Sequence, residues 1–195
     1  MGFTQPGILA AFAVAVLALA AFIQIERRVP EPMVSLGLFK NKEFTISLLV
    51  GFLIFITNFF ANVIWPFYLE NARGLTATTA GYLLMLFPVV QVIIAPLSGS
   101  LSDKKGPYGI TLVGLCVILL AQAGFIFLGL KTSWLLVMAI IVLMGFGNGA
   151  FQSPNNTLIM SAVAPKDLGV AGGLNALARN MGMVVGISAS TTVLY

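Results

Sequence analysis

The feature that most limits the possible fold is a series of long apolar runs, each close to the length of a membrane-crossing helix. A helix rises about 1.5 Å per residue, so about 20 apolar residues cross the ~30 Å hydrocarbon core of a bilayer. Only 8% of the 195 residues are charged and 59% are hydrophobic, whereas about a quarter of a soluble domain is charged. The chain is therefore predicted to be an all-α, polytopic membrane protein. Six runs are predicted to be transmembrane helices: 8–25, 44–68, 80–101, 110–130, 134–160 and 170–195.

The apolar runs and the loops between them divide the chain into three parts. These are a first span in residues 1–25, a charged linker in 26–43 and a bundle of five spans in 44–195. No Lys or Arg precedes the first run, which is atypical of a signal peptide and favours a retained span. The second run ends in Trp65, Phe67 and Tyr68, aromatic residues of the kind that settle at the lipid headgroups. Because the chain begins and ends with a span, we expect it to be part of a longer protein.

Basic residues in the loops indicate which side of the membrane each loop faces. Lys and Arg are enriched in cytoplasmic loops. Arg73 and Lys131 lie on one side. The other eight lie on the opposite side: Arg27, Arg28, Lys40, Lys42, Lys104, Lys105, Lys166 and Arg179. The loops around 26–43, 102–109 and 161–169 are therefore predicted to be cytoplasmic, in a multi-pass protein of the plasma membrane.

Charge and residue types also exclude several classes of function. A net charge of +4 would suit nucleic-acid binding by a soluble protein, but here the basic residues lie in short loops between spans, so no nucleic-acid partner is expected. The chain has no histidine and a single cysteine, Cys116, which argues against a disulfide framework or a histidine-based site. We therefore predict no catalytic residue, metal site or bound cofactor.

Amide side chains recur at helical spacing in two of the predicted spans. The second span carries Asn58, Asn62 and Trp65. The fifth span carries Asn148, Gln152, Asn155 and Asn156. Residues at this spacing share one helix face, and polar groups within a bilayer usually face other protein or a water-filled cavity. We predict that the two stripes form the walls of one polar cavity; the alternative is that the amides only join helices by hydrogen bonds.

Small residues and one arginine stand out in the last two runs. Glycines in these runs have the spacing that lets helix backbones approach closely: Gly145, Gly147, Gly149, Gly182 and Gly186. Arg179 stands within the last apolar run, where an arginine is expensive unless it is paired or reaches water. If that helix begins only near Ala176, Arg179 is instead an ordinary cytoplasmic anchor.

A short charged turn separates the third and fourth runs. Its residues include Gly99, Asp103, Lys104, Lys105 and Gly106. The turn is similar to the signature G-x-L-x-D-(R/K)-x-G-(R/K)-(R/K) that major facilitator superfamily transporters carry between the second and third helices of each half. The match departs after Gly106, since Pro107 and Tyr108 stand where basic residues are expected. The order of features along nearly the whole chain resembles the second half of the fourteen-span drug:proton antiporters.

This resemblance implies a partial major facilitator fold, namely most of a C-terminal half bundle. It implies proton-driven efflux of an amphipathic or cationic small molecule, with the N-terminal half of the same transporter as partner and the proton gradient as energy source. It places the substrate cavity against the second and fifth spans, which carry the amide stripes. It makes the charged turn a gating loop, in which Asp103 stabilises one state by meeting a helix N-terminus or Arg179. No acidic residue lies clearly in the middle of a span, so the coupling carboxylate is expected in the other half.

A second class of function remains open from the sequence. A small membrane protein that assembles as an oligomeric pore or subunit would share the same composition. Two observations distinguish part of a larger transporter from such an oligomeric protein. One is whether further spans precede and follow the chain in its reading frame, and the other is whether transport follows a gradient.

Overall fold

The computed structural model describes residues 36–194 and, nearer the N-terminus, residues 10, 13, 14, 17, 18, 20, 21, 24 and 25. The chain divides into two compact units, Met1–Gly37 and Leu38–Tyr195. The described positions of the first unit are helical, but most of the predicted span 8–25 and of the linker 26–43 lies outside the described residues.

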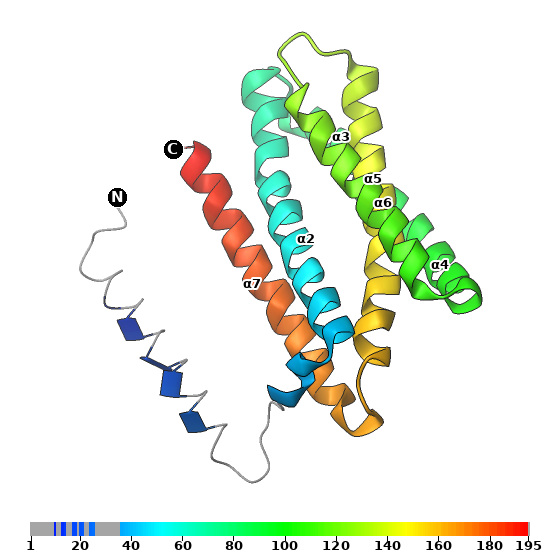
Figure 1. Cartoon of the computed structure of the whole chain (residues 1–195). Helices are drawn as coiled ribbons and strands as arrows, with labels where there is room; N and C mark the ends of the chain where they lie inside the picture. The colour runs from blue at the N-terminus through cyan, green and yellow to red at the C-terminus, as the bar shows by residue number, and fades with distance from the viewer. Residues whose placement is uncertain are drawn as a thin grey trace. The chain divides into compact units, whose positions relative to one another are not determined.

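The second unit is built from helices joined by short turns (Figure 1). The elements in chain order are η1 Leu36–Lys40, α2 Lys42–Phe67, η2 Tyr68–Ala72, α3 Ala77–Leu84, α4 Leu86–Lys105, α5 Pro107–Ile126, α6 Trp134–Ser161, η3 Pro165–Asp167 and α7 Leu168–Leu194. Asn41 caps α2, because its side chain accepts hydrogen bonds from the backbone N–H groups of Glu43 and Phe44.

Among the described residues, four segments are long and apolar enough to cross a membrane: Lys42–Ala72, Ala77–Lys105, Pro107–Ile126 and Trp134–Ser161. They correspond to the second to fifth predicted spans. Helix α7 has 27 residues and is long enough to cross, but its Gly, Asn, Ser and Thr content makes it less apolar, and it is not among the four. The prediction of six spans is therefore not confirmed, whereas a multi-pass membrane protein whose described elements are all helices is.

The third predicted span differs from the observed helices in one respect. It is divided into α3 and α4 at Met85. Pro88 has no N–H to donate to the carbonyl of Leu84, so the regular hydrogen-bond ladder is interrupted there. The backbone bonds from Met85 to Gly81 and from Val89 to Met85 continue on either side, and the two helices remain nearly continuous.

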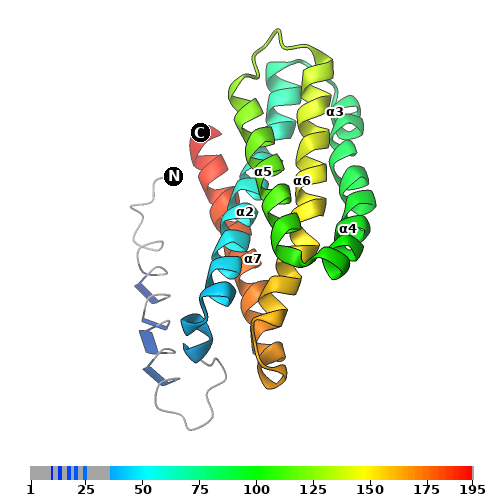
Figure 2. The ribbon, with the colours of Figure 1, turned by 45° about the vertical axis from the view of Figure 1, so that its right-hand side comes forward.

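Helix α6 is the centre of the packing. It makes extensive contacts with α4 and α5 and a smaller contact with α2, while α2 packs mainly against α7. Figure 2 shows α6 flanked by α5 on one side and by α4 on the other. The unit thus consists of an α4–α5–α6 group and an α2–α7 pair, joined where α2 meets α6.

Both of these groups depend on glycines at the helix contacts. A Cβ atom added at Gly145 of α6 would lie 2.6 Å from the carbonyl oxygen of Phe87, and one added at Gly182 of α7 would lie 2.8 Å from that of Phe52. Gly147 and Gly149 are similarly close to α5 and α4. The predicted close approach of helices at these glycines is confirmed.

Arg73 fastens the end of α2 to the loop between α5 and α6. Its Nη1 donates to the carbonyl oxygens of Thr132 at 2.8 Å and Gly129 at 3.3 Å and to the hydroxyl of Tyr68 at 3.2 Å. Its guanidinium carbon lies 4.0 Å from the centroid of the Trp134 ring, within the range of a cation–π interaction. Tyr68 also donates to Gly129, at 2.9 Å.

We expect Gly186→Ala to destabilise the α2–α7 pair. Its Cβ would meet the Ile56 carbonyl oxygen, and relieving such overpacking costs about 1–3 kcal/mol. The apparent Tm in detergent should fall by about 5 °C. The matched control is Gly173→Ala in the same helix, whose Cβ would meet nothing within 4 Å; its Tm should be unchanged or slightly higher. Equal Tm values for the two variants would contradict the packing described.

We expect Arg73→Lys to loosen the α5–α6 loop, since lysine lacks the planar guanidinium that lies on the Trp134 ring and its nitrogen ends one atom short of the Nη1 that reaches three oxygens. Hydrogen exchange of the backbone amides in residues 127–133 should become about tenfold faster, as expected for losing hydrogen bonds to a charged group. Lys131→Gln, which changes an exposed cation in the same loop, should leave exchange unaltered. Equal rates of amide hydrogen exchange in the two variants would show that the Arg73 contacts do not hold this loop.

Candidate functional site

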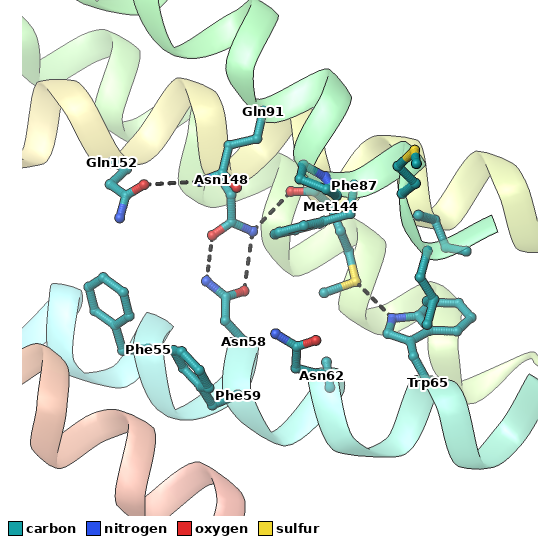
Figure 3. A pocket seen from close by; sticks show the side chains of 15 residues that line it. Phe55, Asn58, Phe59, Asn62, Trp65, Phe87, Gln91, Met144, Asn148 and Gln152 are labelled. Atoms are coloured by element: carbon teal, nitrogen blue, oxygen red, sulfur yellow. Dashed lines mark hydrogen bonds between the residues drawn. The ribbon is translucent and has the colours of Figure 1, made fainter. Parts of the chain in front are cut away.

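A cavity of about 480 Å³ lies among α2, α4 and α6, within the size range of small-molecule sites. Figure 3 shows its side chains. The aromatic lining residues are Phe55, Phe59, Trp65 and Phe87, and the amides are Asn58, Asn62, Gln91, Asn148 and Gln152. In the described part of the chain, no residue lining this first cavity has an ionisable side chain.

Two amides join α2 to α6 across the cavity wall. Asn58 Nδ2 donates to Asn148 Oδ1, and Asn148 Nδ2 returns a bond to Asn58 Oδ1 at 3.2 Å (Figure 3). Asn148 is 4% exposed, and its Nδ2 also donates to the backbone carbonyl of Met144 at 2.9 Å. Both N–H groups of Asn148 are thereby used, which fixes the orientation of its amide and, through the reciprocal pair, that of Asn58.

Trp65 closes one end of the cavity. Its indole Nε1 donates to the sulfur of Met144 at 3.4 Å, and its ring packs against Phe125 at a centroid distance of 4.2 Å. Only 5% of Trp65 is exposed. Trp65 therefore faces the helix contact, whereas Phe67, at 41% exposed, points away from the core. The placement of these aromatic residues at the headgroup level stays a prediction.

The remaining amides of the first cavity differ in what they bond. Gln91 of α4 donates to Gln152 of α6 at 2.9 Å. The Asn62 side chain is exposed, lines the cavity and makes no side-chain hydrogen bond to any residue in the described part of the chain. The sequence prediction omitted Gln91. A lone amide within an apolar run is expensive to bury in a bilayer, and this cost could have identified Gln91 as a candidate site residue.

Two of the predicted cavity residues line a different cavity. Asn155 is buried and donates to the carbonyl of Ser47 at 3.3 Å, whereas Asn156 accepts from Asn175 of α7 at 2.7 Å. Both line a second cavity of about 290 Å³, which shares Phe55 and Gln152 with the first. The structure therefore divides the predicted amide wall between two cavities.

Arg179 also lines the second cavity. Helix α7 begins at Leu168, so Arg179 stands well inside the helix. The alternative of a helix that begins near Ala176 is wrong. Arg179 is the only ionisable residue among the described residues that line this cavity, and its side chain is exposed.

The predicted gating loop forms the junction between α4 and α5. Gly106 ends α4 with φ 86°, in the left-handed region that favours glycine, and Pro107 begins α5, where a missing N–H costs no helical bond. Proline is therefore compatible with this position, where the signature has a basic residue. Lys104 and Lys105 lie in the last turn of α4, where cations are favourable. Asp103 is exposed, and its contact with Arg179 stays a prediction.

Gly99 has a packing role in the same helix. A Cβ at this position would lie 3.0 Å from Ser153 Oγ of α6, so the first glycine of the signature holds α4 close to α6. Ser98, beside it, donates to the backbone carbonyl of Gly149 at 2.7 Å.

We expect Asn58→Ala and Asn148→Ala to be energetically coupled. Interhelical hydrogen bonds in membranes contribute about 0.6–1.7 kcal/mol, so the free energies of unfolding should show a coupling of about 1 kcal/mol in a double-mutant cycle measured in bicelles. Asn58→Ala combined with Gln122→Ala is the matched control, because Gln122 lies on α5 and lines neither cavity. A coupling of zero for the first pair would show that the two amides act independently.

Comparison with known proteins agrees with this architecture. The family model of the Major Facilitator Superfamily matches residues 2–187. The chain is 33% identical over 161 residues to the riboflavin transporter RibZ of Clostridioides difficile, covering 83% of this chain and 35% of RibZ. It is 28% identical over 175 residues to the multidrug resistance protein Stp of Mycobacterium tuberculosis, covering 90% of this chain and 32% of Stp. It is 30% identical over 202 residues to the methylenomycin A resistance protein of Streptomyces coelicolor, covering 100% of this chain and 41% of that protein.

The chain thus spans roughly a third of the length of these curated relatives. The family model nevertheless covers nearly all of it, and the relatives are transporters and resistance proteins, not enzymes. The chain belongs to the major facilitator superfamily of membrane transporters.

Proposed function

We propose that the chain is part of a secondary active transporter that exports drug-like or amphipathic small molecules, coupled to the proton gradient. It would act together with further spans of a longer protein, including an N-terminal half, in the plasma membrane. The observation that carries this proposal is the first cavity, which combines aromatic walls with oriented amides at the contact between α2 and α6. Such a mixture suits ligands that are largely apolar but have a few polar atoms.

The helix packing supports an alternating-access mechanism. The α4–α5–α6 group and the α2–α7 pair are each held by close backbone contacts, whereas α2 and α6 share a smaller contact. Transporters of this kind move relatively rigid bundles around a substrate site near the middle of the membrane. The hydrogen bonds between Asn58 and Asn148 connect the two groups beside the cavity, so a bound ligand would be sensed by both.

The charged turn would control the cytoplasmic opening. With the loops around 102–109 and 161–169 on the cytoplasmic side, Asp103 is exposed at the end of α4, free to meet a helix N-terminus or Arg179 in one state and not in the other. A carboxylate at a helix N-terminus contributes about 0.3–1 kcal/mol. An attraction present in only one state shifts the equilibrium between states by that amount.

The names of two relatives favour efflux as the direction of transport. A multidrug resistance protein and a methylenomycin A resistance protein match most or all of this chain, and export of a toxic compound is a direct route to resistance. RibZ, a riboflavin transporter, shows that the related sequences also include a transporter named for a nutrient, so the proposal depends on a measurement of direction.

The test is dye transport by the complete product of the reading frame in everted membrane vesicles. We expect dye to accumulate when respiration imposes a proton gradient and to leak out when a protonophore removes it. Asp103→Asn should slow transport about threefold, in line with losing up to 1 kcal/mol from one state. Glu43→Gln, the same loss of charge at an exposed position early in α2, is the matched control and should transport normally.

Transport that persists without the gradient would contradict proton coupling and favour a pore. Normal transport by Asp103→Asn would contradict the gating role alone, provided that equal amounts of both variants reach the membrane.

A further inference from the structure

The first cavity has a composition that disfavours a charged ligand on this wall. Its described lining residues have no ionisable side chain, and burying a charge without a partner is far more expensive than burying a hydrogen-bonded polar group. Its aromatic residues, Phe55, Phe59, Phe87 and Trp65, offer flat apolar surfaces. Planar rings pack well against such surfaces by offset stacking or edge contact.

The amides of the cavity differ in how much hydrogen-bonding capacity they have left. Asn148 uses both of its N–H groups, and Asn58 uses one N–H and one lone pair in the reciprocal bonds. Asn148 is thus a positioning residue: its bond to the Met144 carbonyl fixes its amide, which in turn fixes Asn58. Asn58 then presents its second N–H and its free lone pair in a set direction.

Asn62 lies one helical turn beyond Asn58 on the same face of α2, between Asn58 and Trp65 (Figure 3). It lines the cavity and has no side-chain partner in the part of the chain that the structure describes. A free carboxamide presents one donor and one acceptor side by side. It therefore matches a ligand edge that carries an acceptor and a donor at the same spacing, as when asparagine pairs with an adenine edge in DNA recognition.

We propose that Asn62 is a specificity-determining residue that binds, with Asn58 beside it, uncharged planar heteroaromatic compounds through a cis-amide edge, that is, an N–H adjacent to a C=O. Trp65 and the phenylalanines hold the ring, and the amide edge sets its orientation. This inference rests on the proposed function, because it names the class of substrate for that same cavity. The family resemblance allows an amphipathic or a cationic ligand. For the cavity wall that this chain supplies, the inference assigns a neutral ligand.

The experiment compares three probes with one tricyclic skeleton. Phenanthridinone has the N–H and C=O edge, N-methylphenanthridinone has the same ring with the donor blocked, and N-methylphenanthridinium is the planar cation. Their Kd values are measured by fluorescence titration with the purified complete protein in lipid nanodiscs. We expect phenanthridinone to bind about tenfold more tightly than its N-methyl derivative, as for one bidentate pair of hydrogen bonds, and more tightly than the cation.

Two variants assign that preference to Asn62. Asn62→Leu keeps the approximate volume of the side chain and removes the amide, so the preference for the N–H probe should disappear. Gln122→Leu makes the same replacement on α5, outside both cavities, and should keep it. Equal binding of the two lactams by the unaltered protein, no binding of phenanthridinone, or a preference that survives in Asn62→Leu would each overturn the inference.

Dye transport by the same protein in everted membrane vesicles separates this inference from the proposed function. Gradient-driven efflux without a preference for the N–H lactam would contradict only the proposed ligand class. A preference for the N–H lactam without gradient-driven efflux would contradict proton-coupled export, and the cavity would then be a binding site only.

Discussion

The architecture depends on how closely helix backbones approach one another at glycine. Within a bilayer, apolar side chains gain little by leaving lipid for protein, so packing of helices relies on close van der Waals contact and hydrogen bonds. Helix α6 supplies Gly145, Gly147 and Gly149 toward its neighbours, and α7 supplies Gly182 and Gly186 toward α2. A side chain at any of these positions would meet backbone atoms or a branched side chain. The contacts hold α4, α5 and α6 in one group and α2 and α7 in another.

The polar residues are concentrated where these two groups meet. The bonds between Asn58 and Asn148 and the bond from Asn155 to the Ser47 carbonyl all run between α2 and α6. Such bonds between helices contribute about 0.6–1.7 kcal/mol each within a membrane. Under the proposed transport function, a ligand in the first cavity would contact residues of both groups.

Much of this arrangement could be predicted from the sequence, because periodicity determines which residues share a helix face. The spacing of Asn58, Asn62 and Trp65, and of Asn148 and Gln152, places all five on the first cavity. Periodicity does not specify the neighbouring helix. Asn155 shares a face with Asn148 but bonds to Ser47, and Asn156 turns toward α7. The burial of Trp65 depends on Phe125 and Met144, and the clamp at Arg73 depends on loop carbonyls; both contacts join residues far apart in the chain. The interruption at Met85 follows from Pro88 and was accessible to sequence reasoning.

If the proposed function is correct, the face of α2 that carries Asn62 borders a water-accessible cavity that substrate occupies. Cysteine accessibility tests it most directly, with Asn62→Cys introduced into a complete protein whose other cysteines, including Cys116, are replaced. We expect rapid labelling by a membrane-impermeant thiol reagent and protection by a transported substrate, whereas a cysteine at Val92, which is exposed on an apolar membrane-crossing segment and lines neither cavity, should be labelled slowly. Absence of labelling at position 62, or labelling that substrate does not slow, would contradict it.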